Sequence, residues 1–258
     1  MTGAHTTTEL PALVRTAVAP TLNSDVDWDV FDSVEYRDHN YLSVRDDDRE
    51  IVRLIRDFFA RSGVRNGRGV DVGPGANLYP SLAMLPFCRS LELRELSASN
   101  VTWLEQQKPG YDRNWDDFWA IYRENAAYAE VADPRARFRD LTTVRQGTVF
   151  RLPTARWDLG CMFFVACSLS TELAEFEKAV RRFVRALTKD APFATAFMAQ
   201  SKGYQVGDVW FPAVAIGADD VKQALSAVAH NVQVVEIETP NPLRHDVGMI
   251  VATGYATG

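Results

Sequence analysis

The chain has 258 residues, of which 47% are hydrophobic, and it carries a formal net charge of −6 at pH 7. That content is enough to bury a sizeable core, so we expect one α/β domain with an appended segment. The acidic balance, with a pI near 5.3, gives no general electrostatic reason to bind nucleic acid or an anionic membrane, and we expect neither as a partner.

The start of the chain, residues 1–8, lacks the basic beginning and continuous apolar core of a signal peptide. No run elsewhere approaches the ~20 apolar residues needed to span a bilayer, so we expect a soluble, cytoplasmic protein. The three cysteines form no Cys-x-x-Cys pair, and the four histidines are scattered. This pattern argues against a disulfide framework and against a metal site.

Residues 1–62 are expected to form an N-terminal arm and helical cap, ahead of an α/β domain over residues 63–258, in one compact unit. The first 24 residues contain one amphipathic segment bounded by Pro20. This segment predicts an arm or a short helix that packs late, on a partner subunit if the chain forms a homodimer.

A tyrosine pair, Tyr36 and Tyr41, lies in an aromatic and acidic stretch before any predicted strand. Because the two residues are five apart, a helix would put them on different faces. A turn near Asn40 would then be needed to aim both hydroxyls at one place. The alternative is that both rings simply cover the core, and spacing alone favours that role.

The remaining elements alternate between helix and strand. Acidic residues begin a predicted helix over residues 46–60 that should lie against the sheet, and the first strand is centred on Val70 and Val72. Strand, helix, strand, helix in this order implies a parallel sheet with right-handed crossovers. Further strands are predicted over residues 90–96, 143–149, 157–165, 192–198, 232–237 and 248–253, and helices over residues 78–85, 115–122, 171–187 and 219–228, with another from Ser97.

Two later segments have special features. Glycines bracket residues 203–207, which predicts a mobile lid loop that carries Tyr204. Two prolines in residues 240–242 interrupt the last two strands, so these should pair antiparallel through an irregular connection. A parallel sheet that ends in such a hairpin is the usual layout of class I methyltransferases.

The first strand ends at Gly73-Pro74-Gly75, which predicts a tight turn before a helix. Glycines let the backbone come close to a ligand without interference from a Cβ atom. Three interpretations compete. The turn serves packing alone, or it binds a dinucleotide, or it belongs to an S-adenosylmethionine (SAM) pocket. The dinucleotide fingerprint needs a third glycine where the chain has Leu78. The SAM pocket needs an acid at the end of the next strand for the ribose hydroxyls, and Glu95 is placed there.

From about Phe31 to the carboxyl end, the chain resembles the family of small-molecule methyltransferases that includes nicotinamide, phenylethanolamine and thioether methyltransferases, and especially its bacterial members. The motifs that carry the resemblance are the tyrosine pair, Asp71 to Gly75 with Tyr79, the Glu95 to Asn100 spacing, and the aromatic insert after Pro109. The resemblance implies a Rossmann-like class I methyltransferase fold, with a mostly parallel seven-stranded sheet, helices on both faces, an antiparallel last strand and an N-terminal helical cap. It also implies SAM as cofactor, bound by the α/β domain of residues 63–258 under the cap of residues 1–62, and a small-molecule substrate.

The resemblance assigns cofactor roles along the whole pocket. The paired tyrosines would lie over the methionine carboxylate, the glycine turn beside the methionine moiety, and the acid at the ribose. That acid is usually Asp in the family, so Glu95 is one methylene longer. Thr148 stands where the family has an acidic residue beside the adenine. The implied cofactor-binding residues are Tyr36, Tyr41, Gly73, Pro74, Gly75, Tyr79, Glu95, Asn100, Thr148 and Val149.

In the part of the pocket where the methyl acceptor would bind, the sequence differs from that of the family. Amine-methylating relatives place a carboxylate just beyond strand four, and the nicotinamide enzyme places another at the end of strand five. Cys167 and Phe197 occupy these places here, and a thiol at its ordinary pKa offers neither charge nor strong acceptance. Asp246 could replace the lost acids or be a solvated turn residue. The catalytic residues therefore stay unassigned, and the substrate-pocket candidates are Cys167, Phe197, Tyr204 and Asp246.

We expect a SAM-dependent methyltransferase that acts on a small molecule, with N-methylation of an amine or related nucleophile as the first expectation. Two alternatives stay open. SAM could react at its aminocarboxypropyl carbon, by transfer or by intramolecular cyclisation, and release methylthioadenosine. The chain could also be a non-catalytic SAM-binding module whose surface serves a partner.

Overall fold

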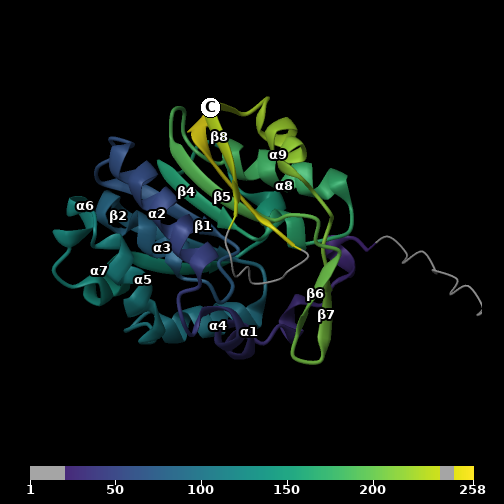
Figure 1. Cartoon of the computed structure of the whole chain (residues 1–258), viewed down its shortest axis with the longest axis horizontal. Helices are drawn as coiled ribbons and strands as arrows, with labels where there is room; N and C mark the ends of the chain where they lie inside the picture. Colours follow the sequence, from purple (N-terminus) through teal and green to yellow (C-terminus); the bar gives the residue numbers. More distant parts are fainter. Residues whose placement is uncertain (1–20, 239–246) are drawn as a thin grey trace, which may run out of the picture.

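A seven-stranded sheet carries the fold, in a computed structural model that describes residues 21–238 and 247–258. Within these residues the strand order is β3-β2-β1-β4-β5-β9-β8, and the first five strands run parallel while β9 runs antiparallel to both neighbours (Figure 1). The predicted fold class is therefore confirmed. The strands are β1 Gly67–Val72, β2 Cys88–Glu95, β3 Thr142–Gln146, β4 Leu159–Phe163, β5 Pro192–Met198, β8 Ala229–Ile237 and β9 Met249–Ala256.

The central strands are buried because helices cover both faces of the sheet (Figure 1). All of β4 is buried, as is β1 except at Arg68. In register, Val70 of β1 lies opposite Glu92 of β2 and Gly160 of β4. Coverage of this kind accounts for the nearly continuous apolar run around β4 in the sequence.

The two faces have separate hydrophobic cores. One core lies under the helices α2 Asp46–Arg61, α3 Tyr79–Met84, α4 Ala98–Gln107, α5 Asn114–Tyr122, α6 Ala126–Ala129 and α7 Pro134–Leu141. The other lies under α8 Leu173–Arg185 and α9 Ala218–Leu225. The aromatic stripe of α5 is core, as predicted, because Trp115, Phe118 and Tyr122 are fully buried.

Two predicted elements differ in the structure. The third strand ends at Gln146, and Val149–Arg151 forms a 3-10 turn instead of continuing it. The predicted lid loop is a hairpin of β6 Gly203–Val206 and β7 Val209–Pro212. The hairpin forms because the apolar run after Gly207 pairs back on the glycine-bracketed segment, and the Trp210 indole packs across Gly203, where an added Cβ would lie 2.4 Å from it.

Hydrogen bonds join the start of the N-terminal cap to α8 and to Thr171 just before that helix. Its main helix, α1 Ser33–Tyr41, contains both tyrosines with no turn between them. Further upstream, the Thr21 backbone N–H donates to Thr171 Oγ1 at 2.8 Å, and the Asn23 N–H donates to Glu175 Oε2 at 2.8 Å. The predicted arm before Thr21 and the irregular connection at 240–242 lie outside the described residues.

Helices in the described ranges are all too short or too polar to cross a membrane.

Phe59 of α2 offers a direct test of the first core, since it is fully buried while its neighbour Phe58 is half-buried. We expect Phe59→Ala to lower the free energy of unfolding by about 3–5 kcal/mol through lost burial and the cavity left behind. Phe58→Ala, a matched control for the deletion itself, should cost clearly less. Urea unfolding of both variants measures the difference, and equal losses would contradict this packing.

Candidate functional site

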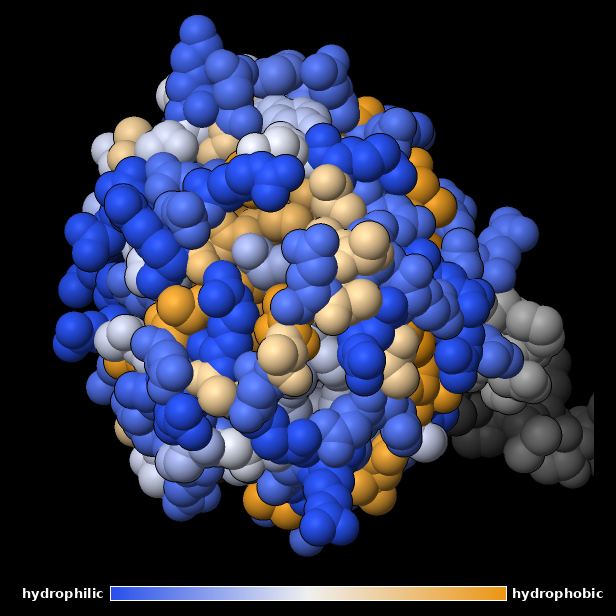
Figure 2. Space-filling model, turned by 90° about the vertical axis from the view of Figure 1, so that its left-hand side faces the viewer, coloured by the Kyte–Doolittle hydropathy of each residue, from blue (hydrophilic) through white to orange (hydrophobic). Residues whose placement is uncertain are grey.

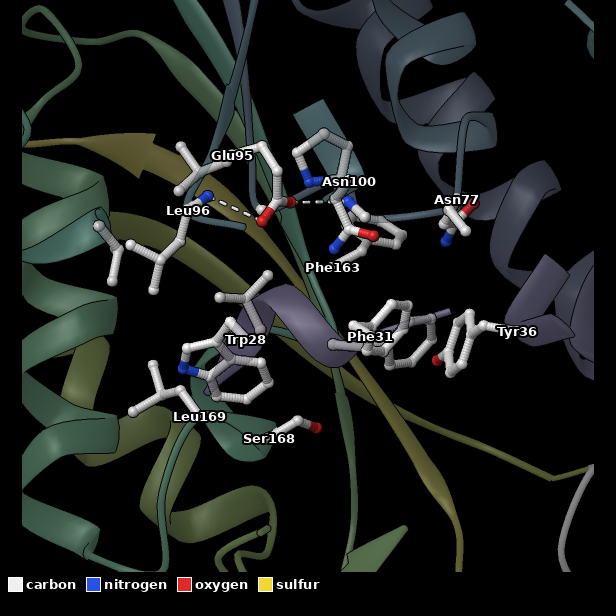
Figure 3. A pocket seen from close by; sticks show the side chains of 18 of the residues that line it. Trp28, Phe31, Tyr36, Asn77, Glu95, Leu96, Asn100, Phe163, Ser168 and Leu169 are labelled. Atoms are coloured by element: carbon white, nitrogen blue, oxygen red, sulfur yellow. Dashed lines mark hydrogen bonds between the residues drawn. The ribbon is translucent and has the colours of Figure 1, made fainter. Parts of the chain in front are cut away.

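A cavity opens at the carboxyl ends of β1, β2 and β4, where a parallel sheet offers its usual ligand site. It spans about 1080 Å³, open solvent at its mouth included. The glycine turn, the end of β2, the segment after β3, the segment after β4 and the N-terminal cap all contribute to its wall. Figure 3 shows labelled side chains of the cap, of the end of β2 and of the segment after β4 around one space.

Nine of the ten sequence-predicted cofactor residues line this cavity: Tyr36, Tyr41, Gly73, Pro74, Gly75, Glu95, Asn100, Thr148 and Val149. The tenth, Tyr79, lies behind the wall. Its ring is fully buried, stacked on Phe118 with centroids 5.4 Å apart and edge-on to Phe163 at 5.7 Å. Tyr79 therefore supports the wall from the core side.

The turn after β1 requires glycine at its first position. Gly73 has φ +66° and Gly75 has φ +52°, both in the left-handed region. The Gly73 N–H donates to the Arg94 carbonyl at 2.7 Å, and a Cβ on Gly73 would lie 2.5 Å from Val165 Cγ2. At Gly75 the nearest atom to an added Cβ is Asn100 Nδ2 at 3.8 Å. The turn is thus packed tightly on the β4 side and open on the cavity side.

Glu95, the last residue of β2, joins the end of that strand to the glycine turn. Its Oε2 accepts from the Gly75 N–H at 3.0 Å, and its Oε1 accepts from the N–H groups of Leu96 at 2.7 Å and Ser97 at 3.0 Å (Figure 3). Burial raises the pKa of the Glu95 carboxyl, and these hydrogen bonds oppose the rise. Glu95 and Arg94 are the two charged residues in the described lining.

Asn100 is hydrogen-bonded both to the cap and to Glu95. The Ser33 hydroxyl of α1 donates to Asn100 Oδ1 at 2.5 Å, and a hydrogen bond from Asn100 lowers the pKa of Glu95. The residue therefore links α1, α4 and the end of β2.

The tyrosine pair meets at one end of the cavity although both residues sit in one helix. Their ring centroids are 6.0 Å apart and edge-on, and both residues line the cavity. A turn near Asn40 is therefore unnecessary, because large rings on different helix faces can still reach one space. Asn77 lines the same end, is only 5% exposed, and its Nδ2 has no hydrogen-bond partner among the described residues.

An aromatic cluster roofs the cavity between the cap and the β6–β7 hairpin. Phe211 of the hairpin contacts Trp28 at 5.5 Å, Phe31 at 5.4 Å and Tyr204 at 5.5 Å, measured between ring centroids. Tyr204, a predicted substrate-pocket residue, lines the cavity together with Trp28 and Phe31. Figure 3 shows Trp28 and Phe31 on the side of the cavity opposite Glu95.

The other acceptor candidates lie elsewhere. Cys167 is fully buried, with its Sγ 3.3 Å from the Met198 N–H, and burial raises the pKa of its thiol. Phe197 is fully buried against Phe176, with ring centroids 5.4 Å apart. Neither lines the cavity, whereas their chain neighbours Ser168 and Met198 do. Adjacent residues of a strand point to opposite sides, which separates Phe197 from Met198 in β5. Cys167 and Ser168 lie in the 3-10 turn Ala166–Ser168, where successive side chains also point in different directions. Asp246 lies outside the described residues.

Several lining residues escaped the sequence analysis. Ser168 and Met198 stand one position from the candidates, so a one-residue shift would have found them. Trp28 and Phe31 reach the cavity only through the packing of the cap on the hairpin, which no local pattern signals. The remaining unpredicted lining residues are Asn23, Asn40, Val72, Ala76, Asn77, Arg94, Leu96, Gly147, Phe163, Phe164, Val165, Leu169 and Ser201.

No group of three or more His, Cys, Asp or Glu residues in the described ranges is arranged to hold a metal ion.

Asp71 lies in β1 two residues before Gly73 and is 1% exposed. The Ser81 hydroxyl donates to its Oδ2 at 2.6 Å, while burial raises the pKa of this carboxyl to about 7. Since the ordinary pKa is near 3.8, the folded state keeps a proton that the unfolded chain releases. Stability is therefore lost as pH rises from about 4 to about 7.

Asp71→Asn should remove this loss. A shift of about three pKa units corresponds to an effect on the order of 4 kcal/mol at most. We expect the variant to gain stability relative to the native chain as pH rises from about 4 to about 7, and the exposed control Asp117→Asn to follow the native profile. Urea midpoints across this range test it, and a constant difference between native chain and Asp71→Asn would contradict the assignment.

No protein-family model and no curated protein matches the chain. Among solved structures, the N-methyltransferase NodS from Bradyrhizobium japonicum WM9, in complex with S-adenosyl-L-homocysteine, is 12% identical with a TM-score of 0.52, covering 88% of this chain and 100% of its own. Magnesium protoporphyrin IX methyltransferase (ChlM) from Synechocystis PCC 6803, with bound SAM, is 12% identical with a TM-score of 0.55, covering 85% and 89%.

The [4+2]-cyclase SpnF is also similar, at 12% identity and a TM-score of 0.50, covering 81% of this chain and 80% of its own. At these identities the likeness shows the fold, which is the Rossmann-like fold of class I methyltransferases. The narrower resemblance to nicotinamide, phenylethanolamine and thioether methyltransferases stays a prediction.

Proposed function

We propose that the cavity binds SAM and that the protein transfers its methyl group to a small molecule. The observation that carries this proposal is the placement of Glu95. The acid ends β2, lines the cavity, and is hydrogen-bonded to the glycine turn after β1. Bound ligands in the similar structures, SAM in ChlM and S-adenosylhomocysteine in NodS, support the choice of cofactor.

The residues present fit the parts of SAM. Thr148, Val149 and Leu96 would hold the adenine, and Glu95 would hold the ribose hydroxyls through the acceptor capacity that remains to its two oxygens. The open side of the glycine turn would accommodate the methionine moiety. The unpaired Nδ2 of Asn77 and the tyrosine pair would receive its carboxylate.

When bound, SAM supplies a methyl group already activated by the adjacent sulfonium. The task of this chain is therefore to orient the acceptor in line with that group and to keep water out. The aromatic roof of Trp28, Phe31 and Tyr204 suits the exclusion of water. An acceptor would lie near Ser168 and Met198, and an amine or related nucleophile is our first expectation.

The lining favours acceptors that need no charged partner, since Arg94 and Glu95 are its charged members in the described part of the chain. An amine would have to arrive as the neutral base. The same feature keeps a second reaction open, in which SAM reacts at its aminocarboxypropyl carbon and releases methylthioadenosine. One of the similar structures is named as a [4+2]-cyclase. The fold alone therefore does not decide between methyl transfer and this second reaction.

Mass spectrometry of products tests the proposal. The native protein is incubated with SAM and a library of neutral amines, thioethers and heteroaromatic compounds. Formation of S-adenosylhomocysteine with a methylated acceptor is the expected result. Methylthioadenosine would select the second reaction, and binding of SAM without any product across the library would favour a non-catalytic SAM-binding module.

Three further expectations, on the roles of the two segments, the oligomeric state and the location, belong to the same proposal. Residues 1–62 act as a cap over the cofactor, and residues 63–258 hold it. A homodimer, tested by sedimentation, and a cytoplasmic location, tested by cell fractionation, stay predictions.

A further inference from the structure

The β6–β7 hairpin stands apart from the main sheet and carries part of the cavity wall (Figure 1). Its two strands form a sheet of their own, and Tyr204 of β6 lines the cavity together with Ser201, just before the hairpin. This part of the wall follows β5, whereas the proposed cofactor residues outside the cap follow β1, β2 and β3. The hairpin therefore borders the space left for the acceptor under the proposed function.

The hairpin depends on the cap for its packing, because a two-stranded hairpin is marginally stable by itself in water. A third hydrophobic core, separate from the two on the sheet faces, lies between cap and hairpin. Its members in the described part of the chain come from these two segments: Val26, Trp28, Phe31, Tyr36, Tyr204, Val206, Val209 and Phe211. Through this cap–hairpin core, the two segments form one packed unit over the cavity.

Phe211 of β7 is the residue that joins the two parts of the cap–hairpin core. Its ring stacks on Trp28 of the cap and on Tyr204 of the hairpin, with interplanar angles of 17° and 23°. It also meets Phe31 at an angle of 57°. Phe211 is 1% exposed and contributes nothing to the described lining, whereas its three partners all line the cavity. Loss of this ring would remove the contact between cap and hairpin but no group from the cavity wall.

The cap is joined on its other side to the residues proposed to hold the cofactor. Ser33 of α1 donates to Asn100 Oδ1 at 2.5 Å. The Ala98 N–H, at the start of α4, donates to Asp29 Oδ1 of the cap at 2.6 Å. Tyr36 of α1 lines the cavity itself. A ligand that fills the proposed cofactor site would therefore contact the cap directly and hold it in place.

We propose that Phe211 is a positioning residue that couples the cofactor site to the wall of the acceptor site. A ligand in the cofactor site holds the cap, the cap orders the hairpin through Phe211, and the hairpin then presents Tyr204 to the acceptor. Because binding of one ligand lowers the entropic cost of binding the other, cofactor and acceptor bind with positive cooperativity. Phe211 acts through its ring partners and touches neither ligand. The inference rests on the proposed function for the identity of the two ligands.

Hydrogen–deuterium exchange read by mass spectrometry tests this coupling with S-adenosylhomocysteine as the probe, so no acceptor is needed. Exchange of the cap amides, residues 21–41, and of the hairpin amides, residues 203–212, is followed with and without saturating ligand in native protein, Phe211→Ala and Phe138→Ala. Phe138 of α7 is fully buried in the first core, against Tyr111 with ring centroids 5.6 Å apart. Its variant controls for the general loss of stability that follows deletion of a buried ring.

In native protein and in Phe138→Ala, we expect the ligand to slow exchange about tenfold in both segments. In Phe211→Ala, the ligand should still slow exchange in the cap, while the hairpin exchanges rapidly whether or not ligand is bound. A merely structural role for Phe211 would speed exchange in the hairpin but leave the effect of the ligand on it intact.

Two outcomes would overturn the inference: native protein whose hairpin exchange is unchanged when the ligand binds, or Phe211→Ala whose hairpin is still slowed by the ligand. If Phe211→Ala does not fold, Phe211→Leu takes its place, since it keeps apolar bulk and loses the ring stacking. It too should lose the ligand effect in the hairpin. Failure of S-adenosylhomocysteine to bind native protein, measured by calorimetry, would instead remove the proposed function.

Discussion

Gly73→Ala is expected to lower the affinity for S-adenosylhomocysteine by about 100-fold and the free energy of unfolding by roughly 2–4 kcal/mol. The added Cβ would lie 2.5 Å from Val165 Cγ2, and the residue would have to keep φ +66°. Movement of the turn to relieve both problems would displace the backbone that lines the cavity. Calorimetric titration and urea unfolding measure the two effects.

Matched variants separate the contact from the backbone conformation. Gly73→Ala combined with Val165→Ala should recover part of the loss, because the clashing methyl groups are gone while the strain of positive φ remains. Gly110→Ala should be close to neutral, since an added Cβ meets nothing within 4 Å there. Native affinity and stability in Gly73→Ala would show that the turn does not form the wall described here.

Glu95→Ala should lower the affinity for SAM and for S-adenosylhomocysteine by about 100-fold, with a loss of roughly 1–3 kcal/mol in unfolding free energy. The carboxylate accepts from three backbone N–H groups, those of Gly75, Leu96 and Ser97, and its removal leaves them without this acceptor. The ribose contact of the proposed function is lost at the same time.

Two further variants are compared with Glu95→Ala: Glu95→Gln as an intermediate case and Glu105→Ala as a control. Glu95→Gln keeps one acceptor oxygen but turns an amide donor toward other donors, so it should fall between native protein and Glu95→Ala. Glu105 is an exposed acid on α4, and its removal should leave binding unchanged. Unchanged SAM affinity in Glu95→Ala, measured by titration, would reject Glu95 as part of the cofactor site.

Much of the fold could be predicted because its elements have strong local patterns. The buried run of β4 and the helical spacing of α2 identify their elements without tertiary information. The position of Glu95 beside the glycine turn could also be predicted from the sequence, because a short crossover brings the carboxyl ends of β1 and β2 to the same edge of the sheet. The hairpin of β6 and β7 could not, because its pairing depends on Trp210 packing across Gly203.

The acceptor side of the site was harder to predict for a physical reason. Whether Phe197 or Met198 faces the cavity depends on the side of β5 on which each lies, which a shift of one residue reverses. Cys167 and Ser168 lie in a short 3-10 turn after β4, whose direction no local pattern in the sequence signals.

Equilibrium dialysis of the native protein against methyl-labelled SAM tests the central claim most directly. The account predicts one SAM bound per chain, displaced fully by unlabelled S-adenosylhomocysteine and unaffected by a dinucleotide such as NAD. Absence of retained label at millimolar SAM with folded protein, or displacement by NAD alone, would contradict it.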